Sequence, residues 1–195
     1  MAAEQNVFQK VAEATHNVVT PANAMDAAAF ALAVESAPRL DTWRGIIKMA
    51  VSYLTDLGDG ATARATGTVR EVGAGVDAAG DKIKTAYVGY QVARRGQADY
   101  DLLAVFGAYN LATAGATVYD RLAHDKPKIE ASIPGKRAMF AGALALGLQI
   151  IGNKVAETDE TKGRAIKLVG TGVGYGGLAH YGVPAVRDYW RKARS

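Results

Sequence analysis

Four aspartates between positions 56 and 81 stand in two pairs whose spacing suits helices. Asp56 and Asp59 are three residues apart, and Asp77 and Asp81 are four residues apart. Because an α-helix completes a turn in about 3.6 residues, the members of each pair share one face of a helix. Gly67 lies between the pairs and can supply a turn that brings the second helix back against the first. The sequence therefore predicts a helical hairpin in which four carboxylates converge.

Carboxylates gathered at one place repel each other unless a cation lies among them. Hard divalent cations with oxygen ligands are the usual solution in proteins. The neighbouring residues are small: Gly60 follows Asp59 directly, Ala63 lies one turn further on, and Gly73 lies one turn before Asp77. Small residues let two backbones, or a backbone and a ligand, approach closely. This favours a ligand site over the alternative of two separate, solvated acidic faces.

The complete pattern reads D-x2-D-G-x2-A-R-x8-G-x3-D-x3-D and begins at Asp56. It resembles the signature of the CDP-alcohol phosphatidyltransferase family, the integral-membrane enzymes that make phospholipid head groups, at all eight fixed positions. Within that family the chain is similar to phosphatidylglycerophosphate synthases and phosphatidylinositol phosphate synthases. The resemblance implies that the protein transfers a phosphatidyl group from CDP-diacylglycerol to a polar alcohol and releases CMP, as a step of phospholipid biosynthesis.

The resemblance also implies a role for each residue of the signature. Two divalent ions, Mg²⁺ or Mn²⁺, would be held by Asp56, Asp59, Asp77 and Asp81. Asp81 would in addition be the catalytic base that takes the proton from the acceptor hydroxyl. The residues expected to bind the CDP part of the donor are Asn23, Gly60, Ala63, Arg64 and Gly73.

Two of these nucleotide-binding residues need comment. Asn23 is included because Thr20–Asn23 resembles the start of the family's first membrane helix, although Asp26 stands where the family often has threonine. Arg64 has an alternative role as an arginine at the membrane interface.

The acceptor is predicted from basic residues outside the signature. Many acceptors of the family carry a phosphate, and Arg121, Lys136 and Arg137 could bind it. Their alternative role is to reach the cytoplasmic membrane surface. Glycerol 3-phosphate is the leading acceptor and inositol phosphate the second. The uncharged stretch Gly107–Asn110, where phosphatidylglycerophosphate synthases often have Gly-Arg-Glu, departs from the pattern for glycerol 3-phosphate.

Hydropathy along the chain predicts an all-α, polytopic membrane protein. Leu102–Tyr119, Ala138–Asn153 and Leu168–Val186 lack Asp, Glu, Lys and Arg, and each approaches the ~20 apolar residues that span a bilayer. Three further segments carry charges, which in two of them are largely the signature aspartates and would face a polar cavity; these segments are Ala22–Pro38, Trp43–Ala63 and Val72–Val92. The expectation is therefore a bundle of six transmembrane helices.

The remaining expectations concern the whole chain. One domain should cover residues 1–195, with residues 1–20 as an amphipathic segment whose Val7, Val11 and Ala14 recur at helical spacing. The pairs Gly170-x3-Gly174 and Gly172-x3-Gly176 suit close helix packing. A homodimer is expected by resemblance.

Charge and composition limit the other possibilities. Lys and Arg are somewhat more frequent on the side of both termini, which favours an integral protein of the plasma or inner membrane with a cytoplasmic active site. No dense basic run points to a nucleic-acid partner, and the absence of cysteine excludes disulfides and thiolate metal sites. The mean hydropathy of −0.01 keeps a soluble helical bundle as an alternative. A helical protein that binds metal or lipid without catalysis is another.

Overall fold

The computed structural model describes residues 6–15, 19–67, 73–124 and 132–195. At positions 57, 59, 60 and 73–81 it describes only the helical backbone. Every regular element in these ranges is helical, as the sequence predicts. The chain divides into two compact units, Met1–Val92 and Ala93–Ser195. The single domain expected over residues 1–195 stays a prediction.

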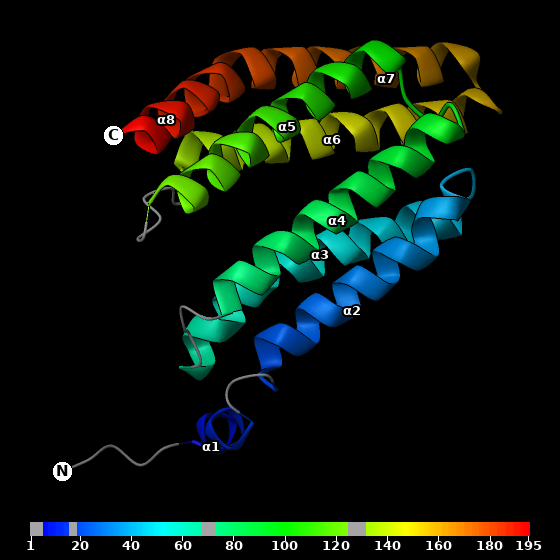
Figure 1. The fold of residues 1–195 in the computed structure, drawn as a ribbon. Helices are drawn as coiled ribbons and strands as arrows, with labels where there is room; N and C mark the ends of the chain where they lie inside the picture. Colours follow the sequence, from blue (N-terminus) through cyan, green and yellow to red (C-terminus); the bar gives the residue numbers. More distant parts are fainter. Residues whose placement is uncertain (1–5, 16–18, 68–72, 125–131) are drawn as a thin grey trace. The chain divides into compact units, whose positions relative to one another are not determined.

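The first unit contains four α-helices and a short 3₁₀ turn within the described ranges. The elements are α1 (Val7–Ala14), α2 (Pro21–Ser36), η1 (Ala37–Arg39), α3 (Trp43–Thr66) and α4 (Gly73–Arg94), the last of which ends just beyond the unit boundary. In Figure 1, α2 and α3 lie side by side, joined by η1.

Local hydrogen bonds explain where the helices of this unit begin and end. The Thr20 hydroxyl accepts a hydrogen bond from the Asn23 amide at 3.1 Å, and Pro21 occupies the first turn of α2, both of which favour a helix start. Thr42 caps α3 in the same way. Gly67 ends α3 with a φ of 66°, a left-handed conformation that glycine adopts without strain. The structure therefore confirms a helix end at Gly67, while residues 68–72 of the predicted turn lie outside the described residues.

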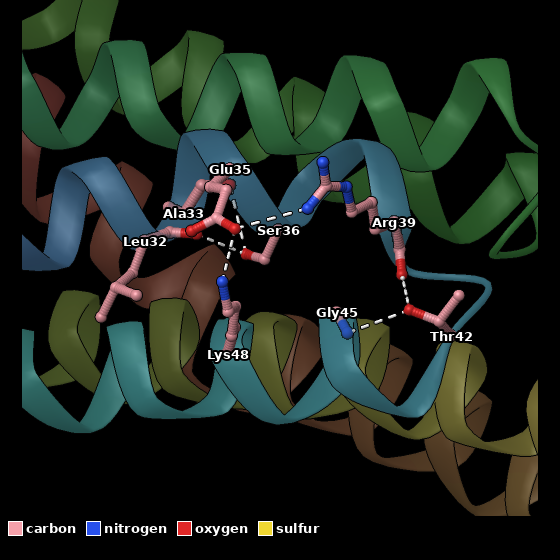
Figure 2. A network of polar contacts seen from close by, with 8 residues as sticks. All are labelled: Leu32, Ala33, Glu35, Ser36, Arg39, Thr42, Gly45 and Lys48. Carbon is pink, nitrogen blue, oxygen red and sulfur yellow. Dashed lines mark hydrogen bonds and ion pairs between the residues drawn. The ribbon is translucent and has the colours of Figure 1, made fainter.

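Small and polar residues hold α2 against α3. The buried Ser52 hydroxyl of α3 donates to the Ala29 carbonyl of α2 at 2.6 Å. Figure 2 shows the end of the α2–α3 pair where η1 joins the two helices. Here Glu35 lies between Lys48 of α3 and Arg39 of η1. The backbone of Gly45 packs directly on the Arg39 carbonyl, so that an added Cβ would overlap it.

The amphipathic segment forms α1 and contacts the end of α3. The Asn6 side-chain amide donates to the Thr66 carbonyl at 3.1 Å. Val7, Phe8 and Val11 are exposed on α1, as expected for a helix that lies on a membrane surface. Residues 1–5 and 16–18 of the expected segment lie outside the described residues.

The second unit consists of three long helices and a shorter continuation. The elements are α5 (Tyr100–Ala123), α6 (Ile133–Ala156), α7 (Glu160–Gly177), the π-helical turn η2 (Leu178–Gly182) and α8 (Val183–Arg194). α6 packs along α7, and α5 packs against α8. The expected helix at Leu168–Val186 is thus part of one longer run of helix that passes through η2.

Glycine lines the contact between α6 and α7. Gly170 and Gly174 are buried and lie against α6 and its neighbours, whereas Gly172 and Gly176 have open space where a Cβ would be. Of the two predicted glycine pairs, one is therefore a packing surface inside this unit. The buried Gln149 side chain adds hydrogen bonds to the Lys167 carbonyl at 3.1 Å and to the Thr171 hydroxyl at 2.8 Å.

Two of the described helices are long and apolar enough to cross a membrane. They are α5, with a mean hydropathy of 1.3 over its most apolar window, and α6, with 1.4. Within the described ranges, the other four expected spans do not combine the length, hydropathy and low charge of a membrane-crossing helix, so a bundle of six spans is not confirmed.

The two glycine pairs generate a stability prediction. A Cβ at position 170 would lie 2.9 Å from the Leu148 Cβ and 3.0 Å from the Ala145 carbonyl oxygen. Gly170→Ala should therefore lower the free energy of unfolding by about 1–3 kcal/mol, the usual cost of overpacking. Gly172→Ala, two residues away, should be neutral or stabilising by up to ~1 kcal/mol, because alanine favours helix more than glycine does. Unfolding in detergent, followed by circular dichroism, measures both; equal effects would contradict the packing described.

Candidate active site

The signature aspartates lie on two neighbouring helices of the first unit. Positions 56 and 59 belong to α3, and positions 77 and 81 belong to α4. The Asp56 side chain is described, while the side chains of Asp59, Asp77 and Asp81 lie outside the described residues. Asp56, its neighbours and the helical backbone form the described part of the site.

Asp56 forms an ion pair with Lys84 of α4. The Lys84 ammonium donates to Oδ1 of Asp56. Lys84 is 6% exposed, so its charge is held away from solvent, and the Asp56 side chain is 25% exposed. A buried ammonium is costly unless an anion accompanies it. The pair therefore shows that the Asp56 face of α3 is turned towards α4.

This ion pair sets the register between the two helices. Asp56 lies ten residues before the end of α3, and Lys84 lies eleven residues after the start of α4. At 1.5 Å per residue, each is roughly 15 Å from the connection between the helices. α3 and α4 are therefore antiparallel neighbours, as Figure 1 also shows.

The register brings the signature positions opposite one another. Position 59 lies three residues after Asp56 along α3, and position 81 lies three residues before Lys84 along α4. Four further residues in the same directions give positions 63 and 77. Positions 77, 81 and 84 share one face of α4 by helical period. The backbone thus places all four aspartate positions within about two turns of the same contact.

α2 brings Asn23 to the same level of the bundle. The Thr62 hydroxyl of α3 contacts the Met25 sulfur of α2 at 3.2 Å. Further along, Ser52 is bonded to Ala29, so the two helices run in opposite directions. This register places Asn23, which is half-buried, beside the stretch of α3 that contains Gly60 and Ala63.

The other expected nucleotide-binding residues occupy the C-terminal part of α3 and the start of α4. Ala63 is half-buried, and Arg64 is exposed in the last turn of α3. Gly60 lies in α3 and Gly73 is the first residue of α4, but what surrounds them lies outside the described residues. Three helices therefore contribute these residues to one end of the first unit.

The donor chemistry of this site fits a hard divalent cation. Aspartate carboxylates are preferred ligands of Mg²⁺ and Mn²⁺. Asp56, whose side chain is the one described among the four signature aspartates, already pairs with the buried ammonium of Lys84. No group of three His, Cys, Asp or Glu side chains close enough for a metal occurs among the described side chains, which include only Asp56 of the four.

Comparison with known families identifies the arrangement. The profile of the CDP-alcohol phosphatidyltransferase family matches residues 14–176. The chain belongs to this family. Among curated proteins and among solved structures, no significant match is found.

Membership in the CDP-alcohol phosphatidyltransferases defines the general reaction. Enzymes of this family transfer a substituted phosphate group from a CDP-linked alcohol to a second alcohol, a reaction of phospholipid biosynthesis, and they generally depend on divalent metals. Membership and the two apolar helices α5 and α6 also indicate a membrane protein. The family match covers α2 to α7 and includes every residue of the signature.

The expected acceptor residues belong to the second unit. Arg121 is in the last turn of α5, and Lys136 and Arg137 are in the first turns of α6. All three are exposed, and the two helix ends adjoin the connection between α5 and α6 (Figure 1). The Arg137 guanidinium also lies over the Tyr181 ring, 5.6 Å from its centroid, a distance at which cation and ring attract each other.

Two tyrosines fix the start of α6, which carries Lys136 and Arg137. The buried Tyr109 hydroxyl of α5 donates to the Gly135 carbonyl at 3.2 Å. The Tyr189 hydroxyl of α8 accepts from the Ser132 amide at 3.4 Å. Gly135 is buried between these side chains, which explains why a glycine precedes the basic pair.

A second basic surface lies at the C-terminal end of α8. This open surface is formed by Arg187, Trp190, Arg191, Arg194 and Ser195. The ammonium of Lys192, and beside it the guanidinium of Arg191, hold the pKa of the Asp188 carboxyl below its ordinary value. Asp188 therefore stays ionised at neutral pH and offsets part of the positive charge of this helix.

Among the described residues of the site, Lys84 is the one that sequence reasoning missed. A signal for it exists, because Lys84 follows Asp81 by three residues and Asp77 by seven, which places it on the aspartate face of α4. Lysine is normally solvent-exposed, so its burial becomes apparent only when α3 is packed against α4.

The tyrosine hydrogen bonds at the start of α6 lead to a second prediction about stability. Tyr109→Phe removes the hydroxyl that bonds the Gly135 carbonyl and should lower the free energy of unfolding by about 0.5–1.5 kcal/mol, the net contribution of one hydrogen bond. Tyr119→Phe on the same helix is the control, because the Tyr119 side chain is exposed and its aromatic contact with Trp190 uses the ring. Thermal unfolding in detergent compares the two; a larger effect at Tyr119 would argue against this anchor.

Proposed function

We propose that this family member transfers the phosphatidyl group of CDP-diacylglycerol to glycerol 3-phosphate and releases CMP. The observation that carries the proposal is the Asp56–Lys84 register, because it aligns both halves of the signature across one helix contact. A phosphate-bearing acceptor is supported by the exposed Arg121, Lys136 and Arg137 at the adjoining ends of α5 and α6.

The reaction requires one bond to form and one to break at the same phosphorus. The acceptor hydroxyl oxygen bonds to the phosphorus that carries diacylglycerol, while the pyrophosphate bond breaks and CMP departs. Asp81 takes the proton of the hydroxyl. Two divalent ions held by Asp56, Asp59, Asp77 and Asp81 would supply charge neutralisation of the pyrophosphate.

The other signature residues are proposed to bind the CDP part. Asn23, level with Gly60 and Ala63 in the α2–α3 register, is suited to hydrogen bonding, while the small residues let the nucleotide approach the α3 backbone. Arg64 in the last turn of α3 and Gly73 at the start of α4 lie next to the connection between these helices. Arg64 is proposed to contact the phosphates, since its guanidinium matches their geometry.

Inositol phosphate is the alternative acceptor. It stays a candidate because the uncharged stretch Gly107–Asn110 departs from the pattern expected for glycerol 3-phosphate. In the structure Tyr109 of this stretch is buried, and the Asn110 side chain donates to the Phe106 carbonyl of its own helix at 2.9 Å. Both acceptors present a phosphate and an attacking hydroxyl, so the same basic residues would serve either.

The cellular setting is part of the proposal. The protein is proposed to be a homodimer of the plasma or inner membrane, as the resemblance to the family suggests. The distribution of Lys and Arg supports an active site open to the cytoplasm. The exposed apolar residues of α1 then lie in the membrane surface.

The catalytic role of Asp81 is tested by CMP release from CDP-diacylglycerol. Asp81→Asn should lower the rate at least about 100-fold, because a positioned general base contributes at least that much. The assay uses detergent-purified protein with Mg²⁺ and offers glycerol 3-phosphate, inositol phosphate, inositol and serine separately. Asp101→Asn, an exposed aspartate in the first turn of α5, is the matched control. An unchanged rate in Asp81→Asn would exclude the base role, and no release with any acceptor would contradict the proposed function.

The acceptor site is tested by neutralising the basic pair of α6. Lys136→Met combined with Arg137→Met should raise the KM for glycerol 3-phosphate about 10- to 100-fold, since hydrogen bonds to charged groups contribute ~1.5–3 kcal/mol. The KM for CDP-diacylglycerol should stay unchanged. Lys162→Met on the exposed start of α7 controls for the loss of positive charge. A rise in the KM for the donor instead of the acceptor would assign the pair to the nucleotide.

A further inference from the structure

Lys84 is a buried cation on the helix face that carries Asp77 and Asp81. Its side chain is 7% exposed, and its ammonium bonds Oδ1 of Asp56. By contrast, Lys48 in the same unit pairs with Glu35 (Figure 2), and the Lys48 side chain is 27% exposed. Both pairs join neighbouring helices, but only Asp56 of the two carboxylates belongs to the proposed metal site.

The position of Lys84 matters because of the charge of the site. The sequence predicts four carboxylates at the contact between α3 and α4, and carboxylates gathered at one place repel each other. A cation among them relieves this repulsion, whether it is a metal ion or an ammonium. The ammonium of Lys84 is attached to the chain and is therefore always present at high local concentration.

We propose that Lys84 is a tethered counter-ion that competes with the divalent metal for Asp56. Before metal binds, Lys84 neutralises Asp56 and keeps α3 and α4 in register. When metal binds, the ammonium withdraws from Asp56, because two cations on one carboxylate repel each other at a distance of a few ångströms. The unbranched four-carbon stem of lysine allows this movement without a change of the backbone. This inference rests on the proposed metal-dependent function.

If Lys84 competes with the metal for Asp56, one substitution of Lys84 should have opposite effects on metal affinity and on the stability of the metal-free protein. Lys84→Met keeps the apolar stem but removes the charge, so the metal no longer has to displace an ammonium. The affinity for metal should rise, while the metal-free protein should become less stable because Asp56 loses its partner. A lysine that merely oriented Asp56 for the metal would give the reverse effect on affinity.

Metal binding by the full-length chain in detergent tests this proposal. Titration with Mn²⁺, followed by electron paramagnetic resonance, should show that Lys84→Met lowers the Kd about tenfold, a change worth ~1.4 kcal/mol. Lys84→Arg, which keeps the charge, should stay close to the wild type. The thermal midpoint of metal-free Lys84→Met should fall, and saturating Mg²⁺ should raise it by more than in the wild type, since tighter binding stabilises more.

Lys48→Met is the matched control. It removes the same charge and also breaks an ion pair between helices, about 12 Å from Asp56 along α3. It should leave the Kd for Mn²⁺ within about twofold of the wild type, because solvent and salt screen charges over this distance. If Lys84→Met does not fold, Lys84→Gln keeps a hydrogen bond to Asp56 without the charge and should also bind Mn²⁺ more tightly.

The outcomes separate this proposal from the proposed function. An equal or higher Kd in Lys84→Met or Lys84→Gln, or an equal fall in Lys48→Met, overturns the competition while the transferase proposal stands. Wild-type protein that binds no Mn²⁺ and releases no CMP overturns both. Tighter Mn²⁺ binding confined to the two neutral Lys84 variants supports the counter-ion role even if none of the tested acceptors is used.

Discussion

The ion pair between Asp56 and Lys84 is the contact on which the candidate site depends. It fixes α3 against α4, and the positions of the signature then follow from the helical repeat alone. An ion pair of this kind adds little net stability, because removing two charges from water costs about as much as their attraction returns. Its contribution is specificity: a shift of one residue in either helix would leave a buried ammonium without Asp56.

The framework around this pair is made of small side chains. Ala29 and Ser52 bring α2 to α3, and Gly170 and Gly174 bring α7 to α6. Small residues supply little hydrophobic area, so the helices are held by close backbone approach and by hydrogen bonds from buried polar groups such as Gln149. The mean hydropathy of −0.01 is low for a family of membrane enzymes because charged residues make up 22% of the chain.

Most of the helices, and the placement of the signature positions on two of them, could be predicted from the sequence because they depend on local spacing; the roles of the site residues stay a prediction. Pro21 after Thr20, and Gly67 between the aspartate pairs, mark helix ends that the structure confirms. Lys84 and the difference between Gly170 and Gly172 could not be predicted, since each depends on which helix packs on which face. The number of membrane spans could not be predicted either. The charges of α3 and α4 that suggest a catalytic site also lower the hydropathy of these two helices, so hydropathy does not decide whether they cross the membrane.

The π-helical turn η2 has a consequence for everything that follows it in the chain. Val183 bonds back to the Leu178 carbonyl, five residues earlier, so this turn holds one residue more than an α-helical turn. One extra residue rotates the subsequent helix by about 100° about its axis. The inward face of α8, with Ala185, Tyr189 and Ala193, is buried as a result of that rotation. η2 thus determines how α8 is rotated about its axis. Without η2, the Tyr189 hydroxyl would turn away from Ser132, and the start of α6 would lose one of its two tyrosine hydrogen bonds.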